Sequence, residues 1–468
     1  MSSSHLITKY SSSKVWRMCL FASLGSFVFG YNVGVVNSTL DVVASVFSWG
    51  DYKSILTAIM AGSMPFGAMI SSVFSGNLSN EIGTRRALMV SNLITLLGAV
   101  VTIIPFTITF GIGRFISGLS VGIYATLVPL YINETAPTEM SGKMGTLVQI
   151  QITSGILVAY AFALVLPTGN YTSNSLTNWW MAMFGFQAVF SMGQFLLFLC
   201  VYKLETPVWL FARNLRESAL ESLKQVYSEE GAQEVLDRMN SAVDRSSILS
   251  LDKGVDPSYS DLLLCKQGSS KLMRLGYLNN FFQQFSGINA ILTFSTSIFG
   301  DLGGGLFMSR VYTVVVGAVN TLPTIVVSSL VDKFGRKILL VLGFVGMAVC
   351  QLFSGFFAGL LSDSNIVFPV LCILLYIVFF ATSTGPICWL YCGEILTPKA
   401  MSICTAFNWF CNAFALFTFP PLKELLGIGL VFWIYTAVCV VGFLYFAFDM
   451  LETKGLSKQE IQRLLTNG

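Results

Sequence analysis

Charged residues are scarce in this sequence: Asp, Glu, Lys and Arg make up 11% of its 468 residues, against about 25% in a typical soluble domain. Hydrophobic residues make up 54%, and the mean hydropathy is +0.71. The net charge of +3 comes from dispersed residues without a basic block, which argues against a nucleic-acid-binding protein. The composition is that of a chain that crosses a membrane many times.

Histidine is nearly absent, since the single residue, His5, stands near the N-terminus. Ten cysteines are present, but none forms a pair with the CxxC spacing of a metal site. Cys388 and Cys392, one helical turn apart, are interpreted as packing residues. The sequence therefore predicts neither a metal nor a cofactor. It also predicts no enzyme, because no His or acid lies within a span for acid–base catalysis.

Long apolar runs alternate with short polar stretches, and each run is close to the roughly 20 residues that a membrane-spanning helix needs. Stretch 203–274 is too rich in charge for the bilayer, but its apolar residues keep helical spacing. The predicted fold class is an all-α membrane protein with twelve transmembrane helices in two six-helix bundles. The predicted parts are a first bundle over 1–202, a cytosolic helical linker over 203–274, a second bundle over 275–449 and a cytosolic tail over 450–468.

The predicted spans follow from the positions of the charges. They lie near 14–40 and 54–76, two between Arg86 and Glu134, two between Met144 and Tyr202, and near 275–299, 307–330, 338–361, 366–392, 400–421 and 428–448.

Basic residues are distributed unevenly between the two sides of these spans. With both termini cytosolic, all but four of the 27 Lys and Arg face the cytosol, as the positive-inside rule requires. The four on the outer side or at outer helix ends are Lys53, Arg114, Arg310 and Lys423. We expect a multi-pass protein of the plasma membrane that works as a monomer. Asn170, in an outer loop, is either a glycosylation site or an unmodified loop residue.

Three short signatures occur twice in the same order, about 250 residues apart. They are a glycine before basic residues (Gly83 and Gly335), a Tyr-x-x-Glu motif (Tyr131 and Tyr391), and Leu-Glu-Thr (Leu204 and Leu451). Such duplication indicates two related bundles. The charges in these signatures predict an inner gate whose ion pairs form in one state and break in another. Its members are Arg85, Arg86, Glu134, Glu205, Arg336, Glu394 and Glu452.

Carboxylates are missing from the middle of every predicted span, whereas neutral amides are frequent there. Carriers coupled to ions or protons usually need an intramembrane acid. An amide both donates and accepts hydrogen bonds, as a sugar hydroxyl does, although amides also join helices to one another. Gln283, Gln284 and Asn289 cluster around Gly287, so we expect substrate contact there. Trp389 could stack on the apolar face of a sugar.

The chain resembles the sugar porter family of the major facilitator superfamily, which includes the facilitative glucose transporters. The resemblance runs from Phe29 to Ile461, and its most specific stretches are 283–290, 332–337 and 452–455. It implies substrate-binding residues at Gln149, Ile152, Gln283, Gln284, Asn289, Asn320, Phe380, Trp389 and Asn412. It also implies an extracellular gate at Thr293 and Phe294. Ser141 and Val208 stand where the family has arginines, so the inner gate departs from the family pattern.

The position after Gly30-Tyr31 bears on the coupling of transport. Proton-coupled members of the family carry Asp there, whereas this chain has Asn32, as the facilitators do. The predicted function is facilitative (uniport) hexose transport by alternating access, with glucose as substrate and fructose left open. The partners expected are the hexose and the lipid bilayer. The alternatives are a proton-coupled sugar or polyol symporter and a sugar sensor that does not transport.

Overall fold

The structure is a computed structural model that describes residues 10–137, 140–168, 178–249, 259–266, 270–360 and 367–454, with 456, 460, 461 and 464. Within these residues the chain is helical, and the one β-type contact is an isolated bridge between Tyr10 and Tyr227. Asn170 lies outside the described residues.

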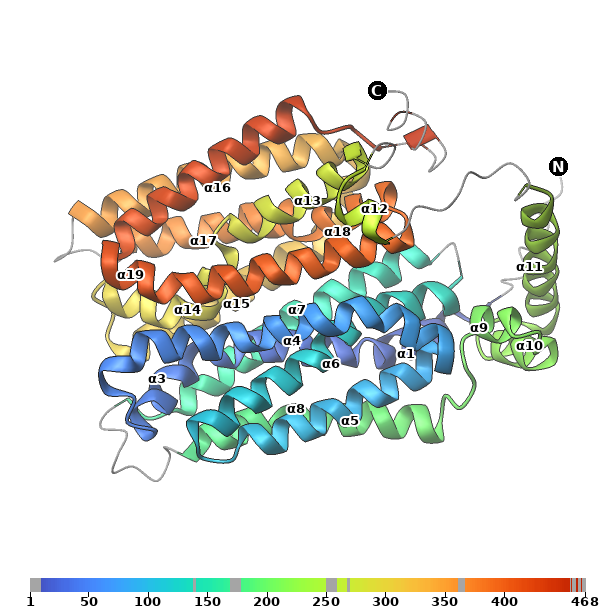
Figure 1. The fold of residues 1–468 in the computed structure, drawn as a ribbon, viewed down its shortest axis with the longest axis horizontal. Helices are drawn as coiled ribbons and strands as arrows, with labels where there is room; N and C mark the ends of the chain where they lie inside the picture. Colours follow the sequence, from blue (N-terminus) through green and yellow to red (C-terminus); the bar gives the residue numbers. More distant parts are fainter. Residues whose placement is uncertain are drawn as a thin grey trace.

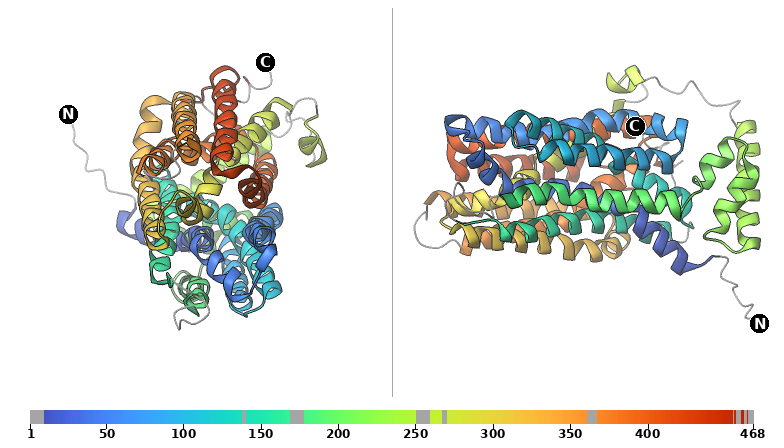
Figure 2. Two further views of the ribbon diagram at one scale, coloured as in Figure 1. Left: turned by 90° about the vertical axis from the view of Figure 1, so that its left-hand side faces the viewer. Right: turned by 90° about the horizontal axis from the view of Figure 1, so that it is seen from below.

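Two bundles of long helices lie side by side (Figures 1 and 2). The first consists of α1 (Ser12–Ala22), α2 (Leu24–Gly34), α3 (Val36–Val46), α4 (Lys53–Ile82), α5 (Thr84–Thr102), α6 (Thr107–Thr135), α7 (Ser141–Phe162) and α8 (Trp179–Cys200), with 3₁₀ turns η1 (Gly50–Tyr52) and η2 (Ala163–Val165). The second consists of α13 (Ser270–Phe285), α14 (Ile288–Asp301), α15 (Leu306–Phe334), α16 (Arg336–Leu360), α17 (Val367–Thr382), α18 (Thr384–Ile395) and α19 (Pro398–Phe448).

Among the described residues, nine helices are long and apolar enough to span a membrane, and the bent pair of 12–34 with α3 makes a tenth. Helix α19 turns back at Gly427, where φ is +75°, so it crosses twice. The pair α13 and α14 forms one further crossing that is more polar than the others. The count is therefore twelve, and the prediction of a twelve-helix membrane fold is confirmed.

The charged linker forms short helices at one end of the molecule, here named the linker end (Figure 1). They are α9 (Pro207–Ala212), α10 (Arg216–Lys224), α11 (Glu229–Leu249) and α12 (Tyr259–Leu263). Ser11 N–H donates to Val226 O at 2.9 Å, so the start of the chain is attached to this linker. The opposite end of the bundles is named the far end.

The most extensive contacts between the bundles are those of α3 with α14, α4 with α19, and α7 with α15. Close approach at the third pair depends on Gly317, because a Cβ there would lie 2.9 Å from the ring of Tyr160. The outward faces carry exposed apolar side chains such as Phe66, Ile108 and Leu342. Such faces suit lipid, and polar side chains of the spans, such as Asn32, Asn37 and Asn280, are buried inside the protein.

Candidate substrate-binding site

The break between α13 and α14 determines the positions of the three amides that the sequence analysis predicted to contact substrate, Gln283, Gln284 and Asn289. Gly287 has φ +97°, in the left-handed region, and a Cβ there would meet Gln351 Nε2 at 2.8 Å and the ring of Tyr435 at 2.9 Å. Only glycine therefore fits at this position. Gln283 and Gln284 lie at the end of α13, and Asn289 lies in the first turn of α14. The broken helix brings the three amides together in the membrane interior.

Asn408 of α19 is the centre of the resulting amide cluster. Its Nδ2 donates to Gln283 Oε1 and to Asn280 Oδ1, both at 2.8 Å, and its Oδ1 accepts from Gln284 Nε2 at 2.6 Å. Asn289 donates in turn to Gln284 Oε1. Each of these amides satisfies the next, so the cluster is ordered before any ligand binds. The sequence analysis did not assign Asn408 to the site.

A small cavity lies between the two bundles beside this cluster. Its lining residues come from α2, α3, α4 and α6 of the first bundle and from α14 and α19 of the second: Val33, Val36, Ala61, Met64, Arg114, Asn289, Thr293, Asn412 and Leu416. The centre of a water-sized sphere can occupy about 10 Å³ of it, which is room for roughly one water molecule. This cavity is too small for a hexose, so sugar binding needs a state in which it is wider.

Arg114 is where the structure corrects the sequence analysis, which placed it at an outer helix end. It lies in the second turn of α6, is 1% exposed and lines the cavity. Its guanidinium donates to Asn32 Oδ1 and to Asn32 O, both at 3.1 Å. Asn32 Nδ2 donates to Gln187 Oε1 at 2.6 Å. Arg114 therefore bonds to a neutral amide, Asn32, which Gln187 holds in turn, at the position that the sequence analysis connected with proton coupling.

The other predicted contacts lie on the helices around the cavity but not in its lining. Gln149 and Ile152 are half-buried on α7, Asn320 is buried on α15, and Phe380 and Trp389 belong to α17 and α18. Gln283 reaches α18 through its Nε2, which donates to Thr384 O at 3.2 Å. Of the nine predicted contacts, the closed cavity brings together Asn289 and Asn412. The remaining seven stay predictions for an open state.

Polar contacts join the two bundles toward the far end. Asn37 of α3 donates to Leu292 O at 2.7 Å and to Ser295 Oγ at 2.8 Å, and it accepts from Thr296 N–H at 3.1 Å. Tyr160 O–H also donates to Leu292 O, and Arg310 donates to the carbonyls of residues 166 and 167. These side chains close the far end, and the sequence did not identify Asn37 or Tyr160 as part of a gate.

The predicted extracellular gate residues have two different environments. Thr293 is 3% exposed and lines the cavity. Phe294 stacks on Phe419 of α19 with ring centroids 5.0 Å apart. Both belong to the second bundle, so a gating role for them depends on how α14 moves against α3.

At the linker end, Glu452 caps the N-terminus of α16. Its carboxylate accepts from the backbone N–H groups of Arg336 at 3.0 Å and Lys337 at 2.9 Å. The Arg336 side chain pairs with Glu394 at 2.7 Å, and Thr453 Oγ1 donates to the other oxygen of Glu394 at 2.6 Å. A carboxylate at a helix N-terminus is favoured by the helix dipole and by unpaired N–H groups.

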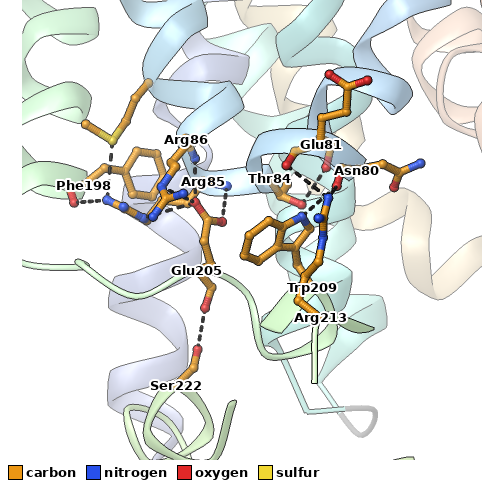
Figure 3. A network of polar contacts seen from close by, with 12 residues as sticks. Asn80, Glu81, Thr84, Arg85, Arg86, Phe198, Glu205, Trp209, Arg213 and Ser222 are labelled. Carbon is orange, nitrogen blue, oxygen red and sulfur yellow. Dashed lines mark hydrogen bonds and ion pairs between the residues drawn. The ribbon is translucent and has the colours of Figure 1, made fainter. Parts of the chain in front are cut away.

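Glu205 has the same capping role in the first bundle, but the side chains around it differ (Figure 3). It accepts from the backbone N–H groups of Arg85 at 2.9 Å and Arg86 at 3.0 Å. The Arg85 side chain donates to Phe198 O at 2.7 Å instead of to Glu134. Glu134 accepts from Thr84 Oγ1 at 3.1 Å. Within the described residues Glu134 has no arginine partner, so the two networks correspond only in part.

Gly83 and Gly335 precede the two capped helices and have φ +100° and +89°. A Cβ at Gly83 would lie 2.6 Å from Glu205 Oε2, and one at Gly335 would lie 2.7 Å from Glu452 Oε2. The glycines in the repeated signatures are therefore required both for backbone conformation and for the approach of the carboxylate.

The two capping carboxylates have opposite pKa shifts. Burial raises the pKa of Glu205 above its usual value, although the backbone donors of Arg85 and Arg86 act against this. Burial also acts to raise the pKa of Glu452, but four backbone N–H donors outweigh it, so the pKa of Glu452 is lowered. The four donors are those of Arg336, Lys337, Thr453 and Lys454.

The arrangement defines a class of protein: a membrane carrier in which two six-helix bundles enclose a polar, neutral-amide site at the level of broken helices. Known proteins agree with this class. A family model described as "Sugar (and other) transporter" matches residues 18–465. The chain belongs to the sugar porter family of the major facilitator superfamily.

Individual relatives cover nearly the whole chain. Plastidic glucose transporter 4 of Arabidopsis thaliana is 31% identical over 98% of this chain and 82% of its own length. The galactose-proton symporter of Escherichia coli (strain K12) is 31% identical over 96% of this chain and 94% of its own length. The partially occluded, inward-open structure of the xylose transporter of E. coli has a TM-score of 0.81 and 26% identity, covering 95% of this chain and 100% of that one.

Proposed function

We propose that this protein is a facilitative carrier, a uniporter, that moves a hexose across a membrane by alternating access between its two bundles. Glucose is the first substrate to test and fructose the second. The observation that carries the proposal is that Arg114, at the cavity, bonds to the uncharged side chain of Asn32 and not to a carboxylate. Proton coupling needs a group in this region that gains and loses a proton during transport, and neither side chain does so in the physiological range.

The chemistry of the site supports a neutral, hydroxyl-rich substrate. Asn289, Asn412 and Thr293 supply both donors and acceptors to the cavity, and the lining residues include no carboxylate. Gln283 and Gln284 lie behind them, held by Asn408. The amides of this site bind hydroxyl groups in pairs of hydrogen bonds, and the cavity lining, which includes Arg114, offers no counter-charge for a cationic substrate.

The remaining parts of the proposal concern the setting of the protein. We take the linker end as cytosolic, because the predicted linker carries many basic residues, so that both termini are cytosolic. Plasma membrane and a monomeric carrier are the setting we propose, with boundaries at 1–202, 203–274, 275–449 and 450–468. Under this proposal Thr293 and Phe294 act at the extracellular gate, and the carboxylate networks of Glu205 and Glu452 lie at the inner gate, where each braces the helix ends on its own side of the bundle interface.

The main alternative is sugar–proton symport, which the names of the E. coli relatives make a serious candidate. Purified protein in liposomes distinguishes the two functions. A uniporter equilibrates labelled glucose to its external concentration and no further, and an uncoupler leaves this endpoint unchanged. Accumulation above the external concentration under an inward proton gradient, lost on adding the uncoupler, would refute the uniport proposal. Competition by unlabelled glucose, fructose and galactose then ranks the substrates.

Asn32→Asp provides the matched variant. The new carboxylate lies opposite Arg114, at the distance of an ion pair, and adds a titratable group beside the cavity. We expect glucose uptake by this variant to depend on pH between about 5 and 8 more steeply than uptake by the unmodified protein. The same slope in both proteins would argue against this position as the determinant of coupling.

A further inference from the structure

Arg114 is a cation whose observed partners are all neutral. Its guanidinium donates to the side-chain oxygen and the backbone oxygen of Asn32. The guanidinium carbon, Cζ, lies 5.7 Å from the centre of the Phe184 ring. Its Nε is buried and has no partner within the described residues. The arginines at the linker end differ in this respect, because Arg85 and Arg336 each lie beside a glutamate.

A buried ion without a counter-charge is expensive, by several kcal/mol in folded proteins. Charged side chains within membrane spans accordingly pair or face a polar cavity. Arg114 faces the cavity between the bundles, and no carboxylate lines that cavity. A small anion that enters this cavity from solution would supply the missing counter-charge.

The size and chemistry of the cavity restrict that anion. There is room for roughly one water molecule, which suits a monatomic ion and excludes a sugar acid in this closed state. Thr293 brings a hydroxyl donor to the same wall, and Asn412, 8% exposed, has an Oδ1 without a partner. The same amide carries an NH₂ group that can donate to an anion.

We infer that the closed, sugar-free carrier binds one small monovalent anion of the chloride class at Arg114, with Thr293 and Asn412 as further donors. The hexose displaces this anion when the site opens and fills. The inference rests on the proposed uniport cycle, in which the empty carrier must close over Arg114 to return. The anion neutralises the cation in that step, whereas in the loaded carrier the sugar hydroxyls occupy the same donors.

The test compares two modes of transport in liposomes containing either chloride or methanesulfonate, an anion too large for the cavity. Net uptake into sugar-free liposomes requires the empty carrier to return, whereas exchange with the same sugar on both sides does not. We expect net uptake to fall about tenfold in methanesulfonate and exchange to stay within about twofold. Equal net uptake in the two salts would overturn the inference, and so would an equal loss in both modes.

Asn32→Asp is the decisive variant, because its carboxylate supplies the counter-charge internally. Its net uptake should be equal in the two salts, whereas Lys53→Gln, which removes an exposed cation at the far end, should keep the chloride dependence of the unmodified protein. Chloride dependence in Asn32→Asp would contradict the assignment to Arg114. No exchange in either salt would overturn the uniport proposal and this inference with it.

A second measurement does not depend on transport. Chloride should raise the thermal unfolding temperature of the detergent-purified protein in a saturable manner, and Asn32→Asp should abolish this shift while methanesulfonate gives none in either protein. Glucuronate distinguishes a carboxylated sugar from a free ion. Competition by glucuronate against glucose, without any chloride effect, would show that the ligand is a sugar acid and that the chloride assignment is wrong.

Discussion

Replacing Asn37 by Ala should open the far end of the carrier. Asn37 makes three hydrogen bonds between the bundles, to Leu292 O, Ser295 Oγ and Thr296 N–H, at 2.7–3.1 Å. At about 1 kcal/mol each, their loss costs the closed state about 3 kcal/mol. This corresponds to a change of about 150-fold in the equilibrium between closed and open far ends. The fold itself should be unaffected, because the bonds lie between bundles and break in every open state.

The distance between spin labels at the far end measures this shift directly. Tyr52 and Leu425 are 72% and 80% exposed and belong to different bundles, so Tyr52→Cys and Leu425→Cys provide the two label sites. We expect Asn37→Ala to move the distance distribution toward longer values. Thr418→Ala is the control, because Thr418 donates only to carbonyls of its own helix. An unchanged distribution in Asn37→Ala would refute the reasoning that these bonds hold the far end closed.

Three further predictions concern the capped helices and the amide cluster. Gly335→Ala should lower the free energy of unfolding by about 2–4 kcal/mol, because of the left-handed backbone and the displaced Glu452 carboxylate; thermal unfolding measures this, with Gly185→Ala, which meets no atom within 4 Å, as the control. Since the pKa of Glu452 is lowered in the folded state, its contribution to stability is present above the unfolded pKa of about 4.3 and is lost as pH falls through the folded value. The unfolding temperature of Glu452→Gln should therefore drop less between pH 7 and pH 3 than that of the unmodified protein, and an equal drop would contradict the assignment. Gln283→Ala and Asn289→Ala should each lower glucose uptake in liposomes at least about tenfold, because each leaves amide partners unsatisfied; unchanged uptake at equal protein content would remove these residues from the site.

The overall fold was predictable because charge is expensive in lipid. Segments without charge therefore had to span the membrane, and the few charges had to lie at helix ends. The same constraint located Glu205 and Glu452 correctly at the linker end. The Leu-Glu-Thr signature indicated this position in both halves. Its Glu caps a helix N-terminus in each, where the helix dipole favours a carboxylate.

Arg114 shows where such reasoning fails. Its position in the sequence lies only seven residues after the start of α6, and seven helical residues advance about 10 Å, roughly a third of the hydrocarbon thickness. An uncertainty of two turns in the helix start therefore decides between the outer surface and the membrane interior. The reliable signal was the residue type, because an arginine inside an apolar span indicates a functional site by default.

The amides illustrate a second limit. Asn37, Asn408 and Asn412 all occur in apolar surroundings, and nothing in their neighbours distinguishes a bundle contact from a cluster centre or a cavity wall. Asn37 meets residues about 255 positions away, so its role depends on how two bundles pack. Local periodicity shows which face of a helix is polar, but not which helix lies opposite.

The contacts at the two ends of the carrier have different roles: those at the far end join the bundles, and those at the linker end do not cross between them. At the far end, Asn37 and Tyr160 bond across the bundles, so these contacts hold a conformational state and must break for the sugar to enter. At the linker end, Arg336 with Glu394 and Arg85 with Glu205 bond within one bundle each. Bonds within a bundle do not change when two rigid bundles rock against each other, so they brace the moving parts.

This difference modifies the idea of an inner latch of ion pairs. The first bundle lacks the arginine partner for Glu134 that Arg336 gives to Glu394. The two linker ends are therefore braced by different contacts: Arg336 with Glu394 in the second bundle, and Glu205 with Arg85 and Arg86 at the first. Contacts of both kinds keep the N-termini of α5 and α16 in place while the two bundles rock against each other.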